Sequence, residues 1–323
     1  MKPTQETIEW MLNSDPALKW QVERDILGLP ESEWQKTRAL TASEGIGARL
    51  LALQDEDGQW AGGAYFPTRE DARALPYVEG EKGQPYIATT WTLNSLREWG
   101  VDASALGDTA DRLDAGCKWE CDDLPYWGGE VDCCINAFTV SNGAWLGRDM
   151  SANVQWFLEH QLEDGGWNCE WIEGDLRSSF HSTLNSLAGL LDYELRTGKN
   201  EKVADARKRA EEYLLQRRLM FRLSTGEPVG PWLNDLAYPL RWNYTIIRAL
   251  NYFRDSAVFS TTQPDPRIAE AADALAAMAN ENGRWVTNDR IPGQVWFDFD
   301  TPVGEESKWL TFFALRALAW ARP

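Results

Sequence analysis

Three side chains that can bind a metal ion begin two neighbouring helical segments of this sequence. Asp132 and Cys134 lie at the start of one segment, and His181, one of only two histidines in the chain, lies at the start of the next. A catalytic zinc ion commonly takes three ligands from the protein, drawn from carboxylate, thiolate and imidazole groups, and keeps one position open. These three residues therefore predict a Zn²⁺ site.

Helix geometry sets a condition on this zinc site. Two residues span about 200° around an α-helix, so Asp132 and Cys134 could share one ion only if Asp132 lies at the helix cap, outside the first turn. In that position Cys134 would lie near the positive end of the helix, which favours its thiolate. Cys169 precedes the His181 segment, and we expect it to be a fourth ligand or a reactive catalytic thiol.

The same residues also fit a purely structural role. Aspartate is a favoured helix-capping residue, and cysteine is among the residue types most often buried. On this alternative Asp132 caps a helix, Cys133 and Cys134 pack in the core, and His181 is a structural histidine without a metal.

A recurring turn marks the elements that must position these side chains. The segment Gln54–Trp60 returns as Gln161–Trp167 and, weakened, as Ala279–Trp285. Each copy lies between two apolar helical segments, and a repeat on this scale indicates a helix pair copied along or around a structure. The segments that follow the three copies are 88–99, 180–193 and 307–320.

The repeats predict an all-α fold and the places where its helices begin. We expect about five to six helix pairs over residues 46–323, preceded by a short helical extension over residues 1–45, and this array must either extend as a solenoid or close into a ring. Ring closure would direct the first turns of the inner helices into a shared central funnel. Its expected wall residues are Trp91, Asn243, Tyr244 and Trp309. The expected helix starts are Thr89–Trp91, Asp132–Cys134, Ser178–His181, Arg241–Tyr244 and Ser307–Trp309, and the best strand signal is Gln294–Asp298.

The two full Gln-x-x-x-Gly-x-Trp turns resemble those of the squalene and oxidosqualene cyclases and the protein prenyltransferase β subunits, which are (α/α) toroids. The resemblance therefore implies that residues 46–323 form an (α/α) toroid. The Asp132, Cys134 and His181 pattern also resembles the zinc site of the prenyltransferase β subunits. This resemblance implies a zinc-dependent enzyme that acts on a hydrophobic small molecule, with isoprenoids as one class. The basic residues that hold a prenyl diphosphate in that family are replaced here by Tyr126 and Gly129, so the diphosphate does not carry over.

Other functions use the same residues differently. The segment from Val131 to Cys134 resembles the Asp-Cys-Thr-Ala-Glu motif of oxidosqualene cyclases, which implies that Asp132 is the proton donor of a metal-free terpene cyclase. A carbohydrate-active (α/α) barrel would use two carboxylates and aromatic platforms. A non-catalytic scaffold would hold a lipid or a protein partner. Transfer, cyclisation and hydrolysis all stay open as reaction types.

Composition limits the partners and the compartment. The 323 residues carry a net charge of −18, which argues against nucleic acid and anionic membrane surfaces as partners. The sequence contains no apolar run long enough to span a bilayer and no signal peptide at its first residues, and it has an odd number of cysteines, five. We therefore expect a cytoplasmic protein with reduced thiols.

Overall fold

The computed structural model describes residues 2–76 and 83–322, and most of the regular structure there is helical. The helices are α1 (Gln5–Leu12), α2 (Pro16–Asp25), α3 (Glu31–Ala39), α4 (Gly45–Leu51), α5 (Glu70–Arg73), α6 (Thr89–Glu98), α7 (Thr109–Gly116), α8 (Cys133–Trp145), α9 (Ser151–Glu159), α10 (Phe180–Thr197), α11 (Glu201–Gln216), α12 (Ile246–Ser260), α13 (Ala269–Ala277) and α14 (Lys308–Ala321). The remaining regular structure described consists of short 3-10 helices and a parallel pair of two-residue strands, β1 (Gln84–Pro85) and β2 (Gly293–Gln294). The predicted helical class is confirmed.

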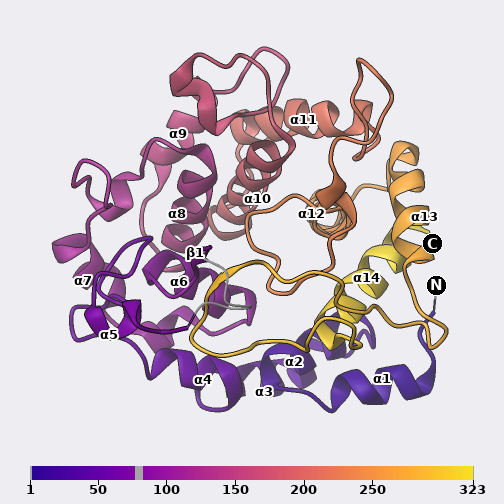
Figure 1. Cartoon of the computed structure of the whole chain (residues 1–323), viewed down its shortest axis with the longest axis horizontal. Helices are drawn as coiled ribbons and strands as arrows, with labels where there is room; N and C mark the ends of the chain where they lie inside the picture. Colours follow the sequence, from indigo (N-terminus) through magenta and orange to yellow (C-terminus); the bar gives the residue numbers. More distant parts are fainter. Residues whose placement is uncertain (1, 77–82, 323) are drawn as a thin grey trace.

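Contacts between helices run in a closed circuit (Figure 1). Helix α6 packs on α8, α8 on α10, α10 on α12, α12 on α14, and α14 on α2. The circuit closes because side chains of α2 bond to the end of α6: Trp20 Nε1 donates to the Trp99 carbonyl at 2.9 Å and Gln21 Nε2 donates to the Glu98 carbonyl at 3.2 Å. Helices α7, α9, α11 and α13 lie outside this circuit.

The first 45 residues share the main hydrophobic core with the rest of the chain. Leu18 and Val22 of α2 are buried in the same cluster as residues of α6 to α14. The two ends of the chain lie near one another in Figure 1, where α1 contacts α14. The predicted division between residues 45 and 46 stays a prediction.

The recurring turn makes the same contacts in all three copies. Its tryptophan is at most 1% exposed, and the indole N–H donates to a carbonyl ten residues earlier, in the preceding helix. The tryptophan backbone N–H donates to a threonine hydroxyl in the first turns of the following helix. The bonded sets are Leu50, Trp60 and Thr89, then Phe157, Trp167 and Thr183, then Leu275, Trp285 and Thr311. Each copy therefore ties one outer helix to one inner helix.

Helix caps explain where the predicted starts are accurate and where one is wrong. Ser179 caps α10 by accepting from the Ser182 N–H, and Ser307 caps α14 in the same way. The start predicted at Arg241–Tyr244 is wrong, because α12 begins only at Ile246. Thr245 is extended and its hydroxyl caps the helix, so the residues before it stay in a loop.

The strand predicted at Gln294–Asp298 is mostly wrong, because β2 consists of Gly293 and Gln294 and therefore includes only the first residue of that segment. Within the described ranges, no helix combines the length and the apolar character needed to cross a bilayer.

Candidate metal centre and its cavity

Three cysteine sulfurs meet where α8 begins. Cys133 and Cys134 form the first residues of α8, and Cys169 begins a short 3-10 helix that follows the second copy of the recurring turn. The Cys169 Sγ lies 3.5 Å from the Cys133 Sγ and 3.2 Å from the Cys134 Sγ. We call these three residues the cysteine cluster; all their sulfurs lie within 4.8 Å of one another. No other set of three histidine, cysteine or acidic side chains comes this close in residues 2–76 and 83–322.

Helix α10 holds the cysteine cluster from its other side. The Ser182 hydroxyl accepts from the Cys169 backbone N–H at 3.2 Å and lies 3.5 Å from the Cys169 sulfur. Asn185, one turn later, donates to the Cys134 sulfur at 3.4 Å. This close approach of α8 and α10 depends on Gly189, where an added Cβ would lie 2.8 Å from the Ala137 carbonyl oxygen. The pairing of the two helices thus positions the sulfurs.

The cysteine cluster favours one thiolate. Hydrogen bonds that join the Cys169 sulfur to the sulfurs of Cys133 and Cys134, together with the Ser182 hydroxyl, hold the pKa of Cys169 well below its usual range. Burial in turn raises the pKa of the Cys133 thiol. A thiolate is the form of cysteine that binds metals and attacks electrophiles.

Asp132 lies beside the cysteine cluster and forms no ion pair with the described residues. It occupies the N-cap of α8 in an extended conformation, yet its side chain makes no capping bond. Burial raises the pKa of Asp132 to about 7, with smaller contributions from the charges of Cys169 and Glu130. Asp132 therefore lies at the helix cap, outside the first turn, which is the position that sharing one metal ion with Cys134 requires.

A cavity of about 800 Å³ adjoins the cysteine cluster, and we call it the cysteine cavity. Aromatic side chains form much of its wall, namely Tyr65, Phe66, Tyr86, Trp119 and Trp242. Asp132, Cys134 and Cys169 also line it. The Asn243 Oδ1 and Gln84 Nε2 atoms, from two further lining residues, are buried and have no hydrogen-bond partner in the described part of the chain. The cavity therefore combines aromatic walls with acidic side chains, Glu120 and Glu130 among them, and with two polar atoms that have no partner in the described residues.

The predicted ligands Asp132, Cys134 and His181 do not form a set as close as the three cysteines. The His181 Nδ1 accepts from the Tyr244 backbone N–H at 2.8 Å, and its ring packs against Trp232 at a centroid distance of 4.5 Å. Burial lowers the pKa of His181 to about 4, so the ring is neutral at pH 7. These contacts give His181 a packing role beside the cysteine cluster, and its role as a metal ligand stays a prediction.

The four residues expected in the funnel wall have different positions. Asn243 lines the cysteine cavity, whereas Trp91 lines a second cavity described below. Tyr244 is fully buried and donates from its hydroxyl to the Leu219 carbonyl, and Trp309 stacks on Tyr238 at 4.4 Å. Tyr244 and Trp309 thus belong to the core.

Sequence reasoning missed Cys133 as a partner in the sulfur group. The signal was present, because Cys133 and Cys134 are adjacent at a predicted helix start, but their directions depend on how α8 meets α10. The aromatic walls at Tyr65 and Trp119 were missed as well, because these residues lie outside the predicted inner helices.

Comparison with known proteins gives no family for this chain. No family model matches it, and no curated protein matches it. Among solved structures, one described as the crystal structure of a protein from Actinoplanes is similar over 96% of this chain and 91% of that chain. The two share 16% identical residues with a TM-score of 0.45, a likeness too distant to support an argument about function.

Proposed function

We propose that this chain is a single (α/α) toroid in which the cysteine cluster binds zinc and the adjoining cavity receives a hydrophobic small molecule as the substrate of an enzyme. The observation that carries this proposal is the meeting of the Cys133, Cys134 and Cys169 sulfurs at the edge of an aromatic cavity. The closed circuit of helix contacts supports the toroid. In this arrangement α1 and α2 form the pair that completes the ring between α14 and α6.

The donor set fits zinc. Zinc–sulfur bonds are about 2.3 Å long, so two sulfurs on one tetrahedral ion lie roughly 3.8 Å apart. The Cys169 sulfur lies 3.2 Å from the Cys134 sulfur and 3.5 Å from the Cys133 sulfur, so binding zinc requires it to move away from them by only a few tenths of an ångström. Three thiolates leave one coordination position open, which is the arrangement of a catalytic site. Bound zinc supplies a Lewis acid and lowers the pKa of a bound water or thiol.

Residues of the cavity have separate roles in this proposal. Tyr65, Trp119 and Trp242 exclude water and pack against an apolar substrate. The free Asn243 Oδ1 orients a substrate hydroxyl or amine by accepting its hydrogen bond. Asp132 provides a carboxyl group for proton transfer at the cavity surface. Isoprenoids are the proposed substrate class, because the recurring tryptophan turn is the feature that this chain has in common with isoprenoid-processing toroids.

Cobalt substitution tests the ligand set. Cobalt bound by several thiolates gives strong charge-transfer absorption that decreases when a thiolate is removed. We expect this absorption in the parent protein and most of it to be lost in Cys134→Ser and Cys169→Ser. Cys117→Ser is the matched control, because Cys117 is buried but outside the cysteine cluster. A parent protein without thiolate charge transfer would rule out the proposed centre.

Metal-free acid catalysis is the second candidate. The Asp132 carboxyl makes no capping bond and lines a cavity whose aromatic rings could stabilise a carbocation. Turnover of an isoprenoid by zinc-free protein, abolished by Asp132→Asn and retained in Cys169→Ser, would favour this candidate over the zinc enzyme.

A further inference from the structure

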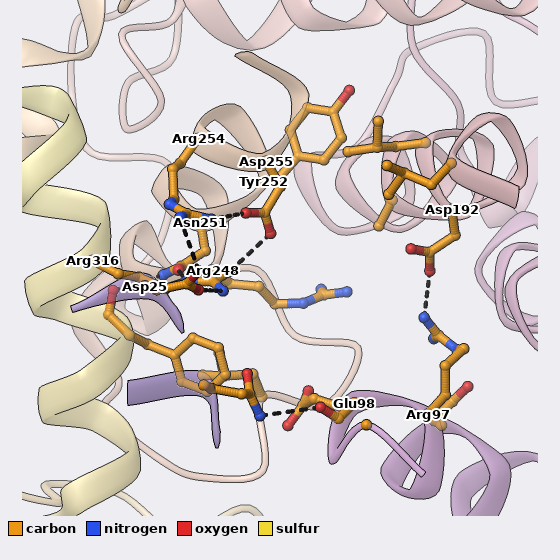
Figure 2. Close-up of a pocket in the computed structure, with 18 of the residues that line it drawn as sticks. Asp25, Arg97, Glu98, Asp192, Arg248, Asn251, Tyr252, Arg254, Asp255 and Arg316 are labelled. Carbon is orange, nitrogen blue, oxygen red and sulfur yellow. Dashed lines mark hydrogen bonds and ion pairs between the residues drawn. The ribbon is translucent and has the colours of Figure 1, made fainter. Parts of the chain in front are cut away.

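Figure 2 shows a second cavity, of about 720 Å³. Its walls come from α2, α3, α6, α10, α12 and α14 and from the loop before α12, which carries Arg241. Eight arginines and four carboxylates line it, with no lysine among the described residues. We call it the arginine cavity. This excess of positive charge is the reverse of the chain as a whole, which carries 32 basic and 50 acidic residues.

One side of the arginine cavity is a closed network of paired charges. The Asp25 carboxylate lies 3.0 Å from the Arg316 guanidinium and 3.3 Å from that of Arg254. Asp255 bonds to the same two arginines, at 2.8 Å from Arg316 and 2.6 Å from Arg254. Figure 2 shows this network on one side of the cavity and the ion pair between Arg97 and Asp192 on the other. These arginines already have acidic partners.

The fourth carboxylate is also satisfied. Glu98 accepts from the Tyr238 hydroxyl at 2.6 Å, and burial raises the pKa of Glu98. Three of the four acidic residues are thus already paired with arginines, and Glu98 acts on Arg241 and Arg248 only from beyond ion-pair distance in the described part of the chain.

Four of the lining arginines have no carboxylate within 4.0 Å in the described part of the chain. They are Arg38, Arg196, Arg241 and Arg248. Arg38 donates to the Gly100 carbonyl, and Arg248 donates to the carbonyls of Trp242 and Asn243. Neutral acceptors leave the charge of a guanidinium uncompensated.

Arg241 is the least exposed to solvent of these four arginines, so its uncompensated charge is the most unfavourable. It is 8% exposed, its Nη2 is buried without a hydrogen-bond partner in the described residues, and its guanidinium lies 4.2 Å from the centre of the Tyr86 ring. Burial lowers the pKa of both Arg241 and Arg248 to about 10, so both stay charged at neutral pH. A buried charge without a partner is unfavourable, and a bound anion would remove that cost.

We propose that the arginine cavity binds a small organic anion through a phosphate or carboxylate group held by Arg241 and Arg248. Guanidinium groups match the oxygen pairs of both anions, and their planar forks favour bidentate bonds. The apolar body of the ligand would pack against Trp91, Phe138 and Phe313, which line the same cavity. A volume of about 720 Å³ lies within the usual range for small-molecule sites.

Calorimetric titration of the full chain tests this proposal with three probes that share a phenyl ring and differ in the polar group attached to it. We expect saturable binding of phenyl phosphate or of benzoate, weakened by added salt, and no saturable binding of phenol. The stronger of the two anions identifies the preferred head group. Absence of saturable binding for both anions at millimolar concentration would overturn the proposal.

Substitutions then locate the site. Arg241→Gln and Arg248→Gln should each weaken anion binding at least about tenfold, because each removes a buried partner of the anion. Arg177→Gln is the control, since Arg177 is exposed and lies outside the cavity, and it should leave the affinity within about twofold.

If circular dichroism shows that Arg241→Gln or Arg248→Gln does not fold, a variant at the rim of the arginine cavity tests the proposal instead. Arg196 is exposed and lines the cavity, so Arg196→Gln should fold and weaken binding about threefold. Affinity unchanged in every folded cavity variant would contradict the assignment. Anion binding lost in Cys169→Ser but kept in the arginine variants would move the anion to the cysteine cavity and would also overturn it.

Discussion

The cysteine cavity and the arginine cavity have similar volumes, but their charged side chains differ in sign. Arginines dominate the cavity at one end of the inner helices, whereas no lysine or arginine is found among the described residues that line the cysteine cavity. Two aspartates show this difference. Arg24, Arg254 and Arg316 overcome the effect of burial and lower the pKa of Asp25 to about 2, while Asp132 has no such neighbours among the described residues and burial raises its pKa to about 7. Neighbouring charge, rather than burial alone, thus separates the two environments.

Several contacts connect the two cavities. The Trp91 ring lines the arginine cavity and packs against Tyr65 and Tyr86 of the cysteine cavity, at centroid distances of 4.9 and 4.8 Å. Asn185 accepts from Arg248 and donates to the Cys134 sulfur. Arg241 also packs on the Tyr86 ring, and Arg248 donates to the carbonyls of Trp242 and Asn243, so these arginines directly contact residues that line the cysteine cavity.

The largest effect is expected from neutralising Asp25. Asp25→Asn leaves Arg254 and Arg316 with less negative charge in a buried setting, and this should lower the free energy of unfolding by about 3–5 kcal/mol. Denaturant unfolding measures the loss. Asp273→Asn, which breaks an exposed ion pair with Arg322, should cost less than about 1 kcal/mol. Equal losses in the two variants would show that the charge network of the arginine cavity contributes no more to stability than an exposed ion pair.

A smaller effect is expected from acid. The folded pKa of Asp25 is about 2, below its ordinary value of 3.8, so its charge stabilises the fold above about pH 4 and this stabilisation is lost as the pH falls toward 2. The shift corresponds to roughly 2 kcal/mol. The difference in unfolding free energy between the parent and Asp25→Asn should therefore narrow by about this amount between pH 5 and pH 2.5. A difference independent of pH would contradict the depressed pKa.

The smallest effect is expected at the connection between the cavities. Asn185→Ala removes the bonds to Cys134, Arg248 and the Trp242 carbonyl and should lower the free energy of unfolding by about 1–2 kcal/mol. Asn282→Ala is the matched control, because Asn282 makes an exposed bond to Glu306, and it should change stability by about 0.5 kcal/mol or less. No loss in Asn185→Ala would mean that this amide does not join the two regions energetically.

The sequence was most informative where contacts are local. The turn ending at Trp60, Trp167 or Trp285 bonds to a carbonyl ten residues before it, so its pattern is visible in a single segment. Caps such as Ser179 and Ser307 are similarly local. The sequence pattern instead predicts a helix start at Arg241–Tyr244, just before the actual cap at Thr245.

The chemistry was harder to predict because it depends on which helices face one another. Cys134 and Cys169 were expected at a metal site, but the part of Cys133 follows from the close packing of α8 on α10. The arginine cavity had no sequence signal at all. Arg241, Arg248 and Arg316 are scattered along the chain, and only the closed circuit of α12, α14 and α2 brings them to one space.

Zinc content is the most direct test of the thiolate centre, measured by mass spectrometry on the purified parent, Cys169→Ser and His181→Ala. A zinc ion held by the cysteine cluster predicts about one zinc per chain in the parent, loss of most of it in Cys169→Ser, and retention in His181→Ala. Loss in His181→Ala would instead support the ligand set of Asp132, Cys134 and His181 that the sequence suggested. Less than about 0.2 zinc per chain in the parent would contradict the zinc centre altogether.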